Sequence, residues 1–131
     1  MAGIVVVLGA IPFADQVVRV AAAEYGWPLK LAHSVSALEN LGKHFDIAAV
    51  VFHLREWHMD PRQTIHEIRV AAPRARPILV HRFTDPFSWP EMAVAGAYHA
   101  IRVPFALAEV RQSFGFVWAA RGVTITRKAV A

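Results

Sequence analysis

Five short apolar runs alternate along this chain with five segments of helical periodicity. Ile4–Leu8 is a continuous β-branched run and Ile47–Phe52 is the most apolar of the five, which is typical of strands covered on both faces of a sheet. Strands that alternate with helices fold into a parallel sheet with right-handed crossovers. The pattern therefore predicts an α/β fold, a doubly wound five-stranded sheet with helices on both faces. The runs are Ile4–Leu8, Leu29–Ala32, Ile47–Phe52, Ile78–Val80 and Ala100–Val103.

Residues that favour helix ends bound the segments between these runs. Ser36 and Glu39 have the spacing of a capping box, in which both side chains satisfy backbone amides at a helix start. Asp60 and Ser88 each stand just before a proline-containing first turn and suit the capping position. The expected helices run from Pro12 to about Tyr25, Ser36 to Lys43, Asp60 to Ala72, Ser88 to Ala95 and Leu107 to Gly122.

The last expected helix carries an apolar stripe that predicts its buried face. Phe116 lies off this stripe and is expected to face solvent, and Gly122 is expected to end the helix. We therefore expect one domain over residues 1–122, followed by a C-terminal tail over residues 123–131. The stripe consists of Leu107, Val110, Phe114, Val117 and Trp118.

The composition excludes several classes of protein. Apolar residues make up 56% of the 131 residues and the mean hydropathy is +0.36, which excludes an intrinsically disordered chain. No apolar stretch approaches the roughly 18 uncharged residues of a membrane helix, and the first residues lack the basic segment of a secretory signal. The absence of cysteine excludes disulfides and cysteine-ligated zinc. We expect a cytoplasmic protein without membrane contact.

The chain is basic, with a net charge of +4 and a pI of about 10.1. Such a charge can indicate a nucleic acid or an acidic partner. Most of the basic residues are scattered and interleaved with acids, and local clusters form only at Arg74 with Arg76 and at Arg127 with Lys128. We interpret the charge as a solvated surface. No helix-turn-helix follows Gly122, so direct DNA binding is not expected.

The alternation favours the flavodoxin-like strand order 2-1-3-4-5, whose functional crevice lies at the carboxyl ends of the strands. Two segments, Phe45–Phe52 and Arg76–Val80, resemble the third and fourth strands of response-regulator receiver domains. Ala95–Ala97 resembles the Gly-Ala element of that family, and Ala100–Phe105 resembles its strand ending in Lys-Pro-Phe. The chain thus resembles a two-component, CheY-like receiver domain along nearly its whole length.

The positions that carry phosphoryl chemistry in this family differ here. The resemblance aligns Leu8 and Gly9 with its paired magnesium-binding acids, His53 with its phosphoacceptor aspartate, and Val103 with its lysine. Arg82 matches the hydroxyl residue after the fourth strand, with His81 as the alternative. Magnesium prefers oxygen ligands, and phosphoryl transfer needs cations that neutralise developing charge. We predict a degenerate pseudo-receiver that is neither phosphorylated on aspartate nor an enzyme and that needs no cofactor.

The same rim allows other roles. One interpretation of His53 is a side chain that fills the vacated pocket and bonds locally. Histidine is also a common metal ligand, although the spacing of the candidates matches no ligand motif. Arginine suits phosphate or carboxylate, and Arg55, Arg82 and Arg102 are candidates for an anionic ligand. A small-ligand or metal-sensing module is therefore the alternative function. The metal candidates are His53, His58, Asp60 and His81.

Aromatic residues predict a contact surface. In receiver domains the surface of the fourth helix, fifth strand and fifth helix commonly mediates dimerisation or output contacts. By resemblance, we expect a protein partner of a signalling pathway, or a second copy of the chain, to bind there. The aromatic side chains could instead cover small residues such as the alanines of the fourth helix. The expected function is that of a stand-alone receiver-like domain in a phosphorelay-type pathway. The interface candidates are Trp89, Tyr98, Arg102, Phe105 and Phe116.

Overall fold

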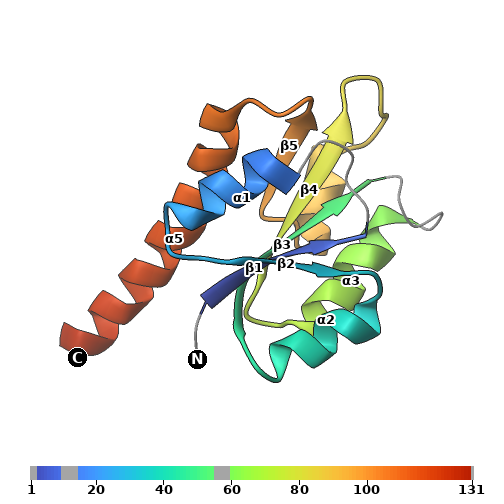
Figure 1. Ribbon diagram of the computed structural model, residues 1–131. Coiled ribbons are helices and arrows are strands. Elements are labelled where there is room, and N and C mark those ends of the chain that lie inside the picture. The colour runs from blue at the N-terminus through green and yellow to red at the C-terminus, as the bar shows by residue number, and fades with distance from the viewer. Residues whose placement is uncertain (1–2, 10–14, 55–59, 131) are drawn as a thin grey trace.

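The computed structural model describes residues 3–9, 15–54 and 60–130, with the backbone alone described for Asp15 and residues 122–130. Strands and helices alternate strictly along the chain (Figure 1). The strands are β1 (Gly3–Leu8), β2 (Leu29–Ala32), β3 (Asp46–His53), β4 (Arg76–Arg82) and β5 (His99–Val103). The helices are α1 (Asp15–Ala23), α2 (Val35–Gly42), α3 (Pro61–Ala71), α4 (Trp89–Ala95) and α5 (Leu107–Val130).

All five strands belong to one parallel sheet with the order β2-β1-β3-β4-β5. This order confirms the predicted flavodoxin-like topology. The most apolar strand, β3, lies at the centre between β1 and β4, which explains why seven of its eight residues are buried. The carboxyl ends of the strands therefore meet at one edge of the sheet.

Helices cover both faces of the sheet (Figure 1). Val5 and Val7 of β1 pack under α1 and α5 in what we call the α1/α5 core. Ile4, Val6 and Leu8 point the other way into the α2/α3/α4 core. Successive side chains of a strand alternate between the faces, so each strand contributes to both cores and the fold has three layers.

The helix starts confirm two of the expected caps and correct the third. The side chain of Asp60 accepts a hydrogen bond from the amide of Arg62, and that of Ser88 accepts one from the amide of Glu91. The capping box expected at Ser36 is wrong, because Ser34 holds the capping position. The backbone of Ser34 is extended, and its Oγ accepts from the Ala37 amide at 3.0 Å. Ser36 lies inside the first turn.

Helix α5 corrects two further expectations. It continues through Gly122 to Val130, because a glycine weakens a helix by about 1 kcal/mol but does not by itself end it. The division into residues 1–122 and 123–131 stays a prediction. Trp118 is 54% exposed and packs beside Tyr25 instead of joining the core. Within the described residues, no helix is both long and apolar enough to cross a membrane.

Candidate functional site

The candidate site is the edge of the sheet formed by the carboxyl ends of β1, β3, β4 and β5. Strand register brings the expected positions to this rim. His53 is the register partner of Val80 on β4, and Arg82 is the partner of Val103 on β5. Leu8 ends β1 beside β3. The structure therefore gathers the expected rim residues along one edge, as parallel strands must.

Arg82 and Val103 lie on the same face of the sheet. Register partners in a parallel sheet share a face, and Val103 packs against the α1/α5 core. His53 follows Val51 of that core by two positions, so its side chain points to this face as well. His81 lies on the opposite face, with its ring 4.6 Å from that of Phe87. This geometry favours Arg82 over His81 as the position matching the family's hydroxyl residue.

The end of β1 offers no side-chain ligand for a cation. Leu8 is 0% exposed and packs in the α2/α3/α4 core. Gly9 has a φ of 85°, a conformation that glycine adopts readily. Its amide donates to the carbonyl of Ala32 at 2.8 Å. This corner of the rim is therefore held by a packed leucine and a backbone hydrogen bond.

The end of β3 carries a buried imidazole. His53 is 7% exposed, and the amide of the next residue, Leu54, donates to the carbonyl of Val80 at 2.8 Å. Buried polar side chains in proteins are normally hydrogen-bonded. His53 therefore belongs to the packed part of the rim.

The end of β4 is fixed by an aspartate that the sequence pattern did not single out. The Arg82 amide donates to Asp85 Oδ2 at 2.8 Å, and the Asp85 amide donates to the Arg82 carbonyl at 3.1 Å. His81 Nδ1 donates to that carbonyl at 3.0 Å. Asp85 is 7% exposed. An aspartate just before a proline is a typical turn signal and would have identified this position.

The described metal candidates do not form one cluster of ligands. Asp60 lies at the start of α3, where its carboxylate binds Arg62 Nη2 at 2.8 Å. The hydrogen bonds from the Arg62 side chain and then from its amide hold the pKa of Asp60 below its usual range. Over residues 3–9, 16–54 and 60–121, whose side chains are described, no three histidine or acidic side chains are grouped closely enough to hold a metal ion. His58 and Arg55 lie outside the described residues.

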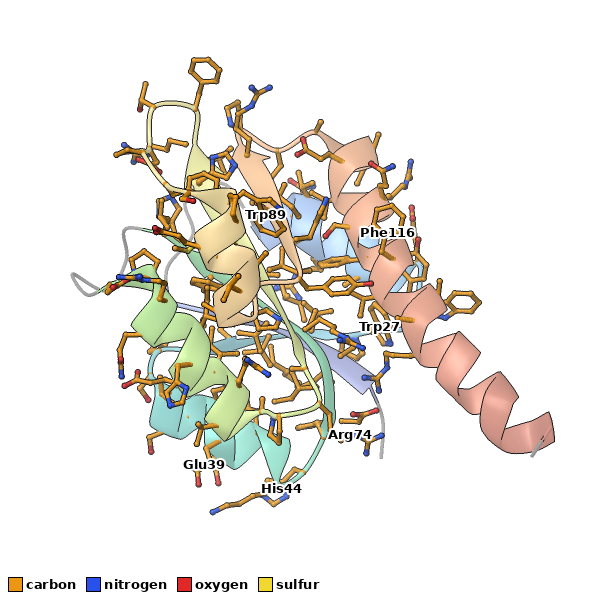
Figure 2. The ribbon with its side chains drawn as sticks, turned by 180° about the vertical axis from the view of Figure 1, so that it is seen from behind. Trp27, Glu39, His44, Arg74, Trp89 and Phe116 are labelled. Carbon is orange, nitrogen blue, oxygen red and sulfur yellow. The ribbon has the colours of Figure 1, made fainter. Side chains whose placement is uncertain are left out.

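The expected contact surface lies over α4, β5 and α5, and we call its five candidate residues the contact face. Trp89 on α4 is 39% exposed and Phe116 on α5 is 49% exposed (Figure 2). The exposure of Phe116 confirms its expected place off the apolar stripe. Tyr98 and Phe105 are half-buried against the α1/α5 core, so they contribute to the fold as well as to the surface. Arg102 is exposed.

Aromatic and cationic side chains add to the contact face. The Arg76 guanidinium stacks over Tyr98 at 5.1 Å, and the Arg102 guanidinium stacks over Phe83 at 5.5 Å. Phe83 is 78% exposed in the loop after β4. The ring of His99 meets that of Phe116 edge to face at 6.0 Å. Neither Phe83 nor Arg76 was expected, because their pairing depends on strand register that a single sequence does not display.

Comparison with known proteins identifies the fold. No family model matches this chain, and no curated protein matches it. A response regulator from Thermotoga maritima has a TM-score of 0.75 and 18% identity, over 91% of this chain and 99% of that chain. The receiver domain of a Pseudomonas aeruginosa PAO1 sensor histidine kinase, with magnesium in its active-site cleft, has a TM-score of 0.65 and 17% identity, over 90% and 99%.

A third solved structure is the beryllofluoride-activated NtrC4 receiver domain dimer. Its TM-score is 0.72 at 16% identity, over 92% of this chain and 98% of that chain. The chain therefore has the fold of response-regulator receiver domains over nearly its whole length. At these identities the similarity establishes the fold, and the activity must be argued from the side chains of the site.

Proposed function

We propose that this chain is a receiver-like signalling domain that works without aspartyl phosphorylation. The observation that carries the proposal is the composition of the rim. The receiver fold is retained, while Leu8 and Gly9 stand at the end of β1 and His53 stands at the end of β3. A signalling role for the retained fold then depends on its surfaces.

Two kinds of position that serve phosphoryl transfer in receiver domains carry unsuitable side chains here. Magnesium requires oxygen ligands in a near-octahedral arrangement, and neither Leu8 nor Gly9 has a side-chain oxygen. The family's lysine neutralises the developing charge of the phosphoryl group, and the matching residue here is Val103, an apolar residue packed on the core. We infer that the domain has no catalytic residues and needs no cofactor, and that His53 is a packing residue.

The contact face is the proposed site of action. Exposed aromatic and arginine side chains are typical anchors of protein interfaces, and this face presents Trp89, Phe116 and Arg102. A protein of a phosphorelay-type pathway in the cytoplasm, or a second copy of the chain, is the proposed partner. The dimeric state of the NtrC4 receiver domain supports the second choice. Direct DNA binding is not part of the proposal.

Intact-protein mass spectrometry tests the absence of aspartyl phosphorylation. The chain is incubated with acetyl phosphate and magnesium, alongside an active receiver domain as the positive control. We expect the control to gain the mass of one phosphate and this chain to remain unchanged. A stable phosphorylated fraction of this chain would contradict the proposal, and peptide mapping would then locate the modified residue.

A further inference from the structure

A small pocket opens at the other end of the sheet from the rim. It lies where α2 and α3 end and β3 begins, and its volume is about 180 Å³. Its walls are mainly apolar and include several small residues, so no large side chain among the described residues fills it. The apolar lining residues that matter here are Gly42, Phe45, Ile47, Ala71, Ala72 and Ala75.

The volume decides what size of group the pocket can hold. Sites for drug-sized molecules have volumes of roughly 300–1,000 Å³, which this pocket does not reach. An apolar cavity of about 150 Å³ is large enough for one benzene molecule. The pocket therefore matches a single aromatic ring or a short branched hydrocarbon group.

The charged side chains around the pocket differ in whether they have an ionic partner. Arg74 lines it and is exposed, and no described carboxylate lies within ion-pair distance of this guanidinium. Asp46 also lines it, but its carboxylate is paired with Arg121 on α5. Lys30 lies over the ring of Phe45, with its Nζ 5.5 Å from the centroid. Among the described side chains, the Arg74 guanidinium therefore has no ionic partner.

Neighbouring groups do not cancel this charge. His44 and Arg74 project at the same end of the molecule (Figure 2). Glu39, also at this end, lines a separate polar groove together with Lys43. Because α2 and α3 both end here, their partial negative charge favours a basic residue. The helix ends explain a cation at Arg74, but they do not explain an apolar cavity left open beside it.

We propose that this pocket binds a small aromatic or branched aliphatic monocarboxylate. The hydrocarbon group enters between α2 and α3, and the carboxylate pairs with Arg74. Carboxylate suits the guanidinium because the two planar groups form paired hydrogen bonds. The site lies far along β3 from the rim and does not depend on the proposed function.

NMR titration of the ¹⁵N-labelled chain tests the site with three defined probes. Phenylacetate carries the ring and the charge, phenylacetamide carries the ring alone, and acetate carries the charge alone. We expect phenylacetate to shift the amides of Gly42, Phe45 and Ala72 saturably, with a Kd of about 1–10 mM. Phenylacetamide should bind about three- to ten-fold more weakly, and acetate should leave these amides unshifted.

Two kinds of variant locate the binding. Gly42→Leu fills the pocket, because a Cβ there lies 3.7 Å from Ile47 Cδ1, an ordinary contact. It should abolish the shifts, and Ala72→Met serves as a second filling variant if Gly42→Leu does not fold. Arg74→Gln should weaken phenylacetate about three- to ten-fold, whereas Arg19→Gln on α1 controls for net charge and should change nothing. Equal affinity for phenylacetate and phenylacetamide, or unchanged binding in the filled variants, would overturn the proposal.

Discussion

The hydroxyl of Tyr98 donates a hydrogen bond to the backbone carbonyl of Phe116, 3.2 Å away, and so joins the start of β5 to the middle of α5. The Tyr98 amide also donates to the carbonyl of Pro77 at 2.7 Å. Removing the hydroxyl leaves the ring and its stacking with Arg76 in place. Tyr98→Phe should therefore lower the free energy of unfolding by only about 0.5–1 kcal/mol. Urea denaturation measures this change, and a loss above about 2 kcal/mol would show that the hydroxyl does more than close this bond.

The exposed aromatic side chains of the contact face should be replaceable without destabilising the fold. Trp89 and Phe116 are partly exposed, so alanine at both positions should leave the melting temperature nearly unchanged while weakening any self-association at least ten-fold. Sedimentation velocity over a concentration series measures the dimer constant. Val20→Ala on α1, which is also exposed, is the matched control and should not affect it.

If the wild-type chain is monomeric throughout this series, the second-copy version of the proposal is wrong. The heterologous partner is then tested with a histidine kinase or response regulator encoded beside this chain, by calorimetry with the wild-type chain, the double alanine variant and Val20→Ala. Unaltered affinity of the Trp89 and Phe116 double variant for such a protein would place the contact elsewhere on the surface.

Gly96 should tolerate no side chain. Its φ is 122°, and a Cβ built there would lie 2.5 Å from Cδ of Arg69. Gly96→Ala should cost about 1–3 kcal/mol of unfolding free energy from the backbone conformation, plus the displacement of Arg69 from the Ala95 carbonyl. In an Arg69→Ala background, Gly96→Ala should still lower the free energy of unfolding, but by less. Urea denaturation of all four proteins gives the coupling energy between the two positions. Equal costs in both backgrounds would mean that Arg69 does not restrict this position.

Protonation of Asp60 at low pH should destabilise the start of α3. Its pKa lies below the 3.8 of an unperturbed aspartate, chiefly because of hydrogen bonds from the Arg62 side chain and amide. The stabilisation is therefore present above about pH 3.8 and is lost as the pH falls through the lowered pKa. The Arg62 amide resonance should titrate with a midpoint below 3.8. Asp60→Asn retains a capping oxygen that does not titrate. In this variant the chemical shift of the Arg62 amide should not change over the same pH range.

The strands and their order could be predicted from the sequence because a buried parallel strand has a distinctive pattern. Val50, Val51 and Phe52 are apolar on successive positions, and this repetition has few explanations other than burial on both faces. The proline-containing first turns after Asp60 and Ser88 were equally informative, since proline and a capping oxygen act locally. The rim residues followed directly, because each lies at the end of a predicted strand or within two residues beyond it.

The features that could not be predicted depend on contacts between distant segments. Val5 pairs with Ala49 although Ile4 pairs with Ile47, so Ala48 is an extra residue that the strand pattern does not reveal. Ser34 and Ser36 compete for the same cap, and only the backbone conformation decides between them. Trp118 has the spacing of a buried residue, yet it lies at the edge of α1, beside Tyr25 and exposed to solvent.

The complete burial of Leu8 limits the substitutions that could give this rim an acidic cation ligand. An aspartate at this position would put a charge into the α2/α3/α4 core, where an unpaired carboxylate costs several kcal/mol. Changing His53 alone to aspartate would not supply a ligand on β1. A magnesium pocket at this rim would therefore take more than one substitution, and the first of them at Leu8 would lower the stability of the fold.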